Sequence, residues 1–327
     1  MYIPRVGFKI SALISSVLTM MAATVCGQTP PEGPRLKIYV VPRESTPPQP
    51  RAGDAIRTGP EGEVVIEWRN DSGESQQRRI QRRNRVAPVI VSEINFAGEG
   101  RVRYSYTVAN GPAARQDIGL FALGVSRPDL MTNLSGPENW TGGGTTPDVP
   151  RCYWYSKKMA SYIKPGQGTG PFRYEVPMLP GFVDAYFQGY LSEQEASSGA
   201  DELDLSPWLL NQIHEALRFE NNSARIKIVG PKIEISPTLN RGQLAEAIAE
   251  EMLAASRMPE FEKHRSFLEE TSSTLKYTHR AASEIRRRIS QMGETVLQQS
   301  FFRAMAFNLE YMEMFRLSLK WNPGVSR

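Results

Sequence analysis

Histidine, cysteine and the short motifs of common enzyme classes are scarce in this chain. Its 327 residues include two cysteines and three histidines, and no two histidines stand four positions apart. A helical H-E-x-x-H zinc site is therefore disfavoured, and neither the G-x-S-x-G nucleophile motif nor the phosphate-binding G-x-x-x-x-G-K-[ST] motif occurs. The sequence thus predicts no catalytic residue, no metal site and no cofactor.

Cysteine is also too scarce for a disulfide framework. Residues 1–27 resemble a secretory signal, because a basic start is followed by an apolar stretch and by small residues that suit cleavage. Cleavage would leave Cys152 alone, and we expect it to be a buried strand thiol rather than a nucleophile. We therefore expect a secreted, periplasmic or cell-surface protein. An uncleaved anchor and a lipid-anchored Cys26 are the alternatives.

Charge of one sign is not in large excess. The formal net charge is +4, and removal of the two basic residues in the signal lowers it to +2. This balance predicts no nucleic-acid partner. The apolar run of the signal is shorter than the roughly 20 residues that a spanning helix requires, so no transmembrane helix is expected after cleavage.

Alternation of apolar and polar residues predicts strands in the first two thirds of the chain. The clearest case is residues 101–108, where Val102, Tyr104, Tyr106 and Val108 share one face. With residues 118–125 this run is expected to form the central pair of a β-sandwich, after a turn with positive φ at Asn110-Gly111. Further strands are expected at residues 36–41, 63–68, 89–96, 152–156, 172–176 and 182–191, with a turn at 179–181 and loops at 70–85 and 126–151. Residues 225–235 alternate as well and could form a final sandwich strand or a hairpin that leads to the next module.

The Y-x-Y-x-V-x-N run of residues 104–110, followed by an apolar strand, resembles bacterial extracytoplasmic immunoglobulin-like or fibronectin type III-like domains. The turn sequences at residues 163–166 and 179–181 are also similar to those of such domains in uncharacterised secreted proteins. The resemblance covers about residues 35–191 and implies an antiparallel immunoglobulin-like β-sandwich. Its motifs are turns and core strands, so no catalytic residue is implied.

Helical patterns then take over, which predicts a fold that is mainly β with an α-helical end. A tether at residues 28–34 would lead to a β-sandwich domain at 35–235, with a helical insert near 206–219 that Ser206 caps. A helical segment is expected at 243–321. The first helix should end at Met258-Pro259, and the rest should form one long helix or a hairpin bent near Gly293 or near residues 271–274.

A seven-residue apolar repeat makes this helical segment the candidate association surface. The candidate association residues are Phe261, Leu268, Leu275, Ile289, Val296, Phe302 and Leu309. They could contact a protein partner or a second copy of the chain.

Two other groups of side chains are candidates for ligand binding. The arginines of the 70–85 loop could bind a polyanion, although a solvated loop is favoured: Arg78, Arg79, Arg82 and Arg83. The aromatic strand could stack on a surface glycan, although core packing is the commoner use of such residues: Tyr153, Trp154 and Tyr155.

The leading hypothesis is an exported, non-enzymatic binding or structural protein whose helices supply the association surface. The first alternative is a glycan- or cell-wall-binding module that uses the aromatic strands and the long loop at residues 126–151. The second is a hydrolase with an unrecognised active site.

Overall fold

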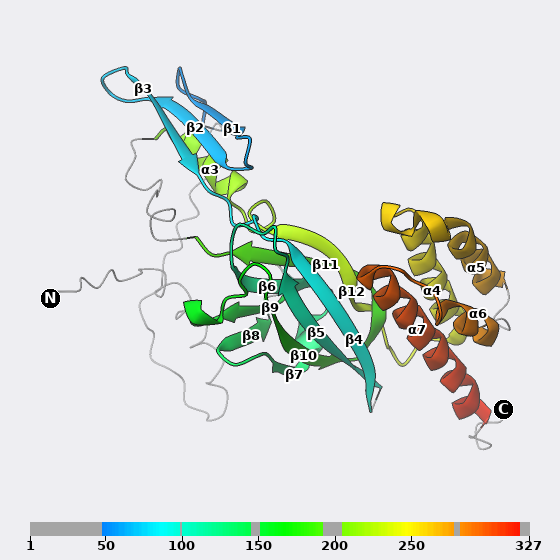
Figure 1. Ribbon diagram of the computed structural model, residues 1–327. Helices are drawn as coiled ribbons and strands as arrows, with labels where there is room; N and C mark the ends of the chain where they lie inside the picture. The colour runs from blue at the N-terminus through cyan, green and yellow to red at the C-terminus, as the bar shows by residue number, and fades with distance from the viewer. Residues whose placement is uncertain (1–47, 99, 145–150, 192–204, 278–281, 321–327) are drawn as a thin grey trace, which may run out of the picture. The chain divides into compact units, whose positions relative to one another are not determined.

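The computed structural model describes residues 48–98, 100–144, 151–191, 205–277 and 282–320, without the side chains of 277 and 315–320. These residues belong to one compact unit, residues 47–327. They form three antiparallel sheets and five α-helices, four of which follow residue 240 (Figure 1). The predicted combination of β-structure with C-terminal helices is confirmed. The predicted signal, tether and first strand, at residues 1–27, 28–34 and 36–41, lie outside the described residues.

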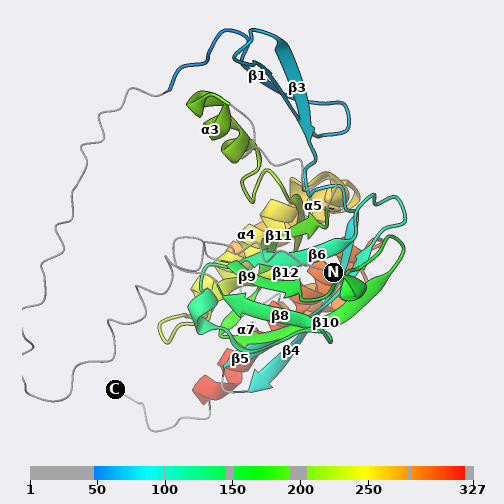
Figure 2. The same ribbon diagram turned by 90° about the vertical axis from the view of Figure 1, so that its left-hand side faces the viewer.

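Two of the sheets pack face to face as a sandwich (Figures 1 and 2). The four-stranded sheet has the order β4 (Pro88–Gly98), β5 (Arg101–Asn110), β10 (Gly168–Val176), β7 (Thr132–Ser135). The five-stranded sheet has the order β12 (Ala224–Glu234), β11 (Met178–Gly189), β6 (Ile118–Gly124), β9 (Arg151–Ser156), β8 (Trp140–Gly144). The predicted final strand at 225–235 is therefore confirmed as β12, an edge of the sandwich.

An aromatic core fills the space between these two sheets. Tyr104 and Tyr106 of β5 are fully buried, as their alternation predicts. The ring of Tyr106 meets Phe121 of the opposite sheet edge to face, with 5.9 Å between centroids. The buried hydroxyls have partners, because Tyr104 Oη donates to Met178 O at 2.8 Å and the hydroxyls of Tyr106 and Tyr174 lie 2.8 Å apart. Such pairing offsets the cost of burying a polar group.

The two runs expected to form a central pair do not pair with each other. β5 lies between β4 and β10, whereas β6 lies between β11 and β9 in the other sheet. The predicted turn with positive φ at Asn110-Gly111 is also wrong, because neither residue has a positive φ. Instead the buried amide of Asn110 bonds to the backbone of three segments. Its Nδ2 donates to the carbonyls of Gln116 (2.8 Å) and Ile163 (3.0 Å), and its Oδ1 accepts from the amide of Ala87 (3.0 Å).

Two predicted loops contain strands. The 126–151 loop holds β7 and β8, and the glycines of β8 make room for neighbouring side chains. A Cβ on Gly142 would lie 2.8 Å from Trp154 Nε1, and one on Gly143 would lie 2.8 Å from Tyr153 Oη. These glycines give no alternation that a sequence pattern could detect.

The 70–85 loop holds β3 (Ser75–Ile80), which joins β1 (Ala55–Thr58) and β2 (Val64–Arg69) in a small three-stranded sheet. β3 is polar on both faces apart from Ile80, so it carries no strand signal. Helix α3 (Pro207–Ala216) packs on this sheet, and the side chain of Ser206 caps it as predicted. The small sheet and α3 have their own core, so residues 35–235 do not form a single sandwich: Val64, Ile66, Trp68, Ile80, Leu205, Leu209 and Ile213.

The helical segment consists of α4 (Arg241–Ser256), α5 (Arg265–Tyr277), α6 (Ala282–Ile289) and α7 (Val296–Lys320). The predicted break at Met258-Pro259 is confirmed, and the chain turns again at Gly293, where φ is +108°. The alternative bend near 271–274 is wrong, because these residues lie within α5. There Ser272 Oγ donates to the carbonyl of Ala249 in α4 at 2.8 Å.

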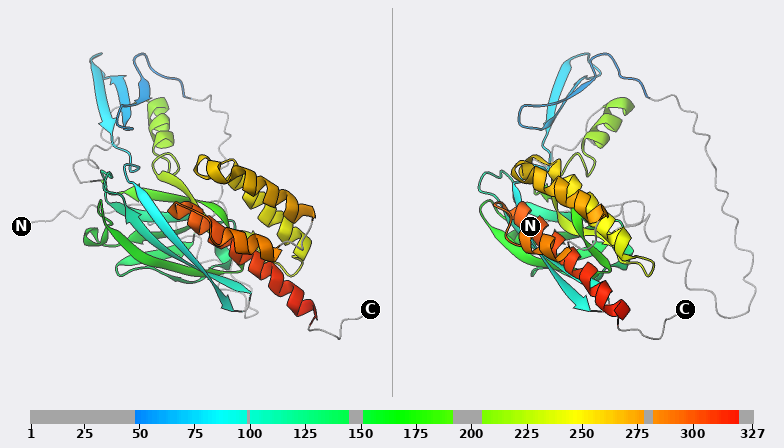
Figure 3. Two further views of the ribbon diagram at one scale, coloured as in Figure 1. Left: turned by 45° about the vertical axis from the view of Figure 1, so that its right-hand side comes forward. Right: turned by 90° about the vertical axis from the view of Figure 1, so that its right-hand side faces the viewer.

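The helices pack on the sandwich at an irregular point of β11. The expected turn at 179–181 is absent, because these residues continue β11 through a shift in its register between Leu179 and Pro180. Asn308 Nδ2 of α7 donates to Pro180 O at 2.7 Å, and the amide of Phe182 donates to Glu251 Oε2 of α4 at 2.7 Å. Phe182 also stacks on Phe301 with 4.7 Å between centroids. Figure 3 shows α7, in red, lying along β4, in cyan, and Phe307 of α7 stacks on Phe96 of β4.

Candidate functional site

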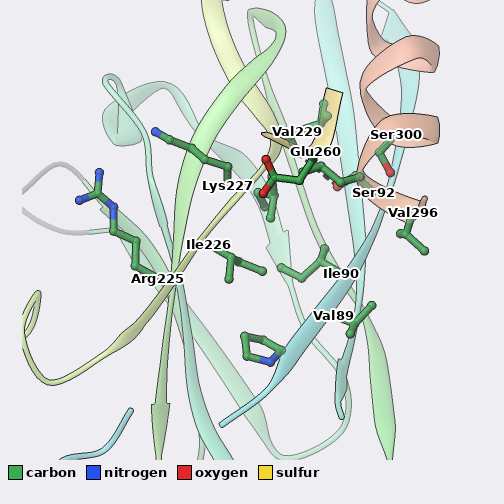
Figure 4. Close-up of a pocket in the computed structure, with 13 residues that line it drawn as sticks. Val89, Ile90, Ser92, Arg225, Ile226, Lys227, Val229, Glu260, Val296 and Ser300 are labelled. Carbon is green, nitrogen blue, oxygen red and sulfur yellow. Dashed lines mark hydrogen bonds between the residues drawn. The ribbon is translucent and has the colours of Figure 1, made fainter. Parts of the chain in front are cut away.

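The candidate site is a groove of about 400 Å³ between β4, β12 and the start of α7 (Figure 4). We call it the junction groove. Most of its lining is apolar, and Ile90 and Ile226 point toward each other across it. Val89 is 47% exposed and Val296 is 40% exposed, so the lining is open to solvent. An open apolar groove of this kind is typical of a place where another molecule binds.

Two unpaired strand edges border the junction groove. In the described sheets β4 pairs only with β5, and β12 pairs only with β11. A hydrogen bond links the two edges where the buried Ser92 Oγ of β4 donates to Val229 O of β12 at 3.2 Å. Beyond this contact the groove lies between the two strands. The free edges therefore leave backbone donors and acceptors without a strand partner.

The hydrogen bonds around Val229 identify which backbone groups of β12 are free. Val229 stands opposite Phe182 of β11, yet Val229 O bonds to Ser92 and the amide of Phe182 bonds to Glu251. This pair is therefore of the non-hydrogen-bonded kind, which recurs at every second position of an antiparallel ladder. The register is regular from Phe182 onward, so Lys227 and Arg225 belong to the same kind. Their backbone N–H and C=O groups point away from β11, toward the free edge.

The charged side chains of β12 do not make the groove strongly basic. Arg225 and Lys227 point away from the groove in Figure 4, and both bind Asp184 on the outer face of the sheet, at 2.6 and 2.8 Å. Burial would raise the pKa of Asp184, but the hydrogen bonds and charges of the two cations together lower it below its ordinary value. Asp184 is therefore ionised at neutral pH and balances part of their charge.

The structure does not gather the four candidate arginines into one cluster. Arg78 and Arg79 are consecutive residues of β3 and so face opposite sides of the small sheet. Arg79 binds the buried Glu63 at 3.2 Å. Arg82 and Arg83 follow β3, and residues of the sandwich bind their main chain. Gln116 Nε2 donates to Arg82 O at 2.9 Å, and Gly189 N donates to Arg83 O at 2.6 Å.

The three aromatic residues of β9 do not share a face either. Trp154 is fully buried in the sandwich core, and its Nε1 donates to Ser135 O at 3.0 Å. Tyr153 and Tyr155 lie on the outer face, with 6.3 Å between their centroids, and Tyr155 is 41% exposed. Successive side chains of a strand point to opposite faces, so Trp154 faces the core whereas Tyr153 and Tyr155 face outward. Cys152 is buried on the core side with a free thiol, as expected, and burial raises its pKa.

Six of the seven candidate association residues are buried within the chain: Phe261, Leu268, Leu275, Ile289, Phe302 and Leu309. Their apolar stripe packs the helices against one another and against the sandwich, so these side chains are not available to a partner in this fold. The exception is Val296, which is exposed and lines the junction groove. Val89 and Val91 are surface residues that the sequence pattern did not identify as a candidate site. The available signal was that β4 is apolar on both faces at this end.

Comparison of the chain with protein-family models, with curated proteins and with solved structures finds no match. Among the described residues, no group of three or more His, Cys, Asp or Glu side chains could hold a metal ion. None of the helices in the described part of the chain combines the length and apolarity needed to cross a membrane.

Proposed function

We propose that this chain is an exported, non-enzymatic binding protein that holds an extended peptide segment of a partner protein in the junction groove. The observation that carries the proposal is the free backbone edge of β12 at Arg225 and Lys227 beside an apolar groove. A peptide that adds a strand to such an edge gains main-chain hydrogen bonds, and pockets for its alternate side chains give specificity.

The chemistry of the groove supports a peptide with alternating apolar residues. Its backbone would pair with Lys227 and Arg225, and every second side chain would contact the apolar lining at Val89 and Val296. The far end of β4, by contrast, is covered and could not accept a peptide. There α7 covers the strand, and Phe307 stacks on Phe96 with 4.0 Å between centroids. The groove is the part of this junction that α7 leaves open.

An immunoglobulin-like ancestry of the sandwich is part of the proposal. The order β4-β5-β10-β7 corresponds to A-B-E-D of an immunoglobulin domain, and β12-β11-β6 corresponds to G-F-C, with β9 and β8 extending that sheet. Seven strands keep the immunoglobulin chain order: β4, β5, β6, β7, β10, β11 and β12. β8 and β9 depart from it, because they follow strand D in the chain instead of preceding it. Such a fold hosts many unrelated functions, so the role is argued from the groove and not from the architecture.

Export and a role for the helices complete the proposal. The signal-like residues 1–27 support secretion to the periplasm, the cell surface or the medium. The helical segment would contribute to partner binding through Val296 and Leu297, which form one wall of the groove. In this proposal the association surface of the helical segment is the first turn of α7, and the buried apolar stripe has no part in it.

The test is a selection of short random peptides displayed on phage against the folded chain without residues 1–27. We expect enriched peptides with alternating apolar residues. Binding of a synthetic copy should fall at least tenfold with Val89→Asp or with Val296→Asp. Met159→Asp is the matched control, because Met159 is 59% exposed and does not line the groove. Failure to enrich any such peptide, or equal loss with all three variants, would refute the proposal.

A further inference from the structure

The outer face of the four-stranded sheet carries two neighbouring rows of polar side chains. The backbone register sets Glu93, Ser105, Arg173 and Ser135 in one row across β4, β5, β10 and β7. The second row contains Asn95, Arg103 and Glu175, and Asn133 joins it from β7. The rows surround a depression of about 450 Å³, a volume within the usual range for small-ligand sites. We call it the sheet depression.

Hydrogen bonds fix the floor of the sheet depression. Glu175 is 8% exposed, and its Oε1 accepts from Arg103 Nε at 2.8 Å and Nη2 at 2.6 Å. Its Oε2 accepts from Asn133 Nδ2 at 2.8 Å. Asn133 is itself held in a left-handed conformation, with φ of +53°. These charge-assisted bonds hold the side chains in place before any ligand arrives.

Several groups around this floor have no strong partner among the described residues. Arg173 makes one long contact, from its Nε to Ser105 Oγ at 3.4 Å, and no salt bridge to a described residue. Nη1 of Arg103 has no bond to a described residue. The same is true of the carboxylate of Glu93 and the amide of Asn95. Unused donors and unused acceptors therefore stand side by side in the depression.

This mixture of donors and acceptors indicates the class of ligand. A site for an anion would present donors alone, but here two carboxylates balance two guanidinium groups, and Glu93 would repel a negative charge. A hydroxyl group both donates and accepts, so adjacent hydroxyls can bond to an amide, a guanidinium and a carboxylate in turn. Ser105 is the shortest side chain at the centre of this lining, so the longer side chains of Arg103 and Arg173 form the walls of the depression.

We propose that the sheet depression is a binding site for a neutral, hydroxyl-rich ligand, the sugar ring of a glycan. The residues that bind it are Arg173, Arg103, Glu93 and Asn95, and Glu175 and Asn133 position them. This site is separate from the junction groove, and it lies on the sheet opposite the aromatic strand β9.

The test uses a glycan array that carries neutral and acidic oligosaccharides, followed by titration calorimetry with the strongest ligand. Ser105→Val fills the depression with a residue that suits a strand and should lower the affinity at least tenfold. Arg173→Ala should have a similar effect. Thr107→Val is the matched control, because Thr107 lies on the same face of β5 two residues along and does not line the depression. It should bind as the unchanged chain does.

Each alternative result has a defined meaning once thermal unfolding shows that the variants are folded. Absence of glycan binding by the unchanged chain overturns the proposal, and so does a preference for acidic glycans alone. Loss of binding with Tyr155→Ala but not with Ser105→Val would assign the glycan to the outer face of β9 instead. The groove variants Val89→Asp and Val296→Asp should leave glycan binding intact, so failure of either proposal can be distinguished from failure of the other.

Discussion

Replacement of Glu251 tests how the helices are attached to the sandwich. This carboxylate is 8% exposed and accepts a 2.7 Å hydrogen bond from the amide of Phe182, at the irregular point of β11. Glu251→Ala would leave that buried amide without a partner, which costs about 1–3 kcal/mol, and would also open a space. We expect a loss of about 3 kcal/mol in the free energy of unfolding, measured by urea denaturation at neutral pH. Glu251→Gln keeps an acceptor oxygen and should lose far less.

The ionisation of Glu251 should also make the stability of the chain depend on pH in a defined direction. Burial raises the pKa of Glu251, and this outweighs the opposing hydrogen bond from Phe182 and the attraction of Lys232 and Lys227; the neighbouring Glu250 adds to the rise. An acid with a raised pKa in the folded state binds its proton more tightly there than in the unfolded chain. Its ionisation therefore lowers stability as the pH rises from its ordinary pKa of 4.5 through the folded-state value.

Glu251→Gln removes this ionisation, so its stability relative to the unchanged chain should improve between about pH 4 and pH 7. The assay is urea denaturation of both chains and of Glu251→Ala across that range. If Glu251→Gln were as unstable as Glu251→Ala at pH 7, the negative charge itself would be required. The account of Glu251 as a hydrogen-bond acceptor carrying an unfavourable charge would then be wrong.

Three further predictions concern the sandwich. Asn110→Ala breaks three buried hydrogen bonds to the backbone, so we expect a loss of about 3 kcal/mol in denaturant unfolding, and a loss below 1 kcal/mol would contradict the role given to this amide. Trp154→Ala should cost about 3–5 kcal/mol by the same measurement, whereas Tyr155→Ala should stay within about 0.5 kcal/mol; similar values for both would place Trp154 outside the core. The thiol of Cys152 should resist a thiol-reactive dye in the native chain and react after denaturation, and fast native labelling would show it to be accessible.

Local features of the fold could be predicted from the sequence because they depend on neighbouring residues. The alternation of Tyr104 and Tyr106 identified a core strand, and Ser206, Pro259 and Gly293 marked where helices begin or where the chain breaks. Strand pairing depends instead on contacts between residues that are far apart in the chain. The pattern of β5 and β6 therefore identified two strands but could not show that they belong to different sheets.

The candidate sites were harder to predict for the same reason. A seven-residue stripe such as Phe261 to Val296 looks the same whether a partner or the chain's own sheet covers it. The consecutive residues Tyr153, Trp154 and Tyr155 formed one group in the sequence, but a strand divides them between core and surface. The free edge of β12 consists of backbone atoms, which no side-chain pattern records.

The most direct test of the central claim is amide hydrogen exchange along β12. In the free protein the amides of Arg225 and Lys227 should exchange fast while those of Ile226 and Ile228, bonded to β11, exchange slowly. Addition of a selected peptide should slow Arg225 and Lys227 and leave their neighbours unchanged. Slow exchange at Arg225 and Lys227 in the free protein, or no change when the peptide binds, would contradict strand addition at this edge.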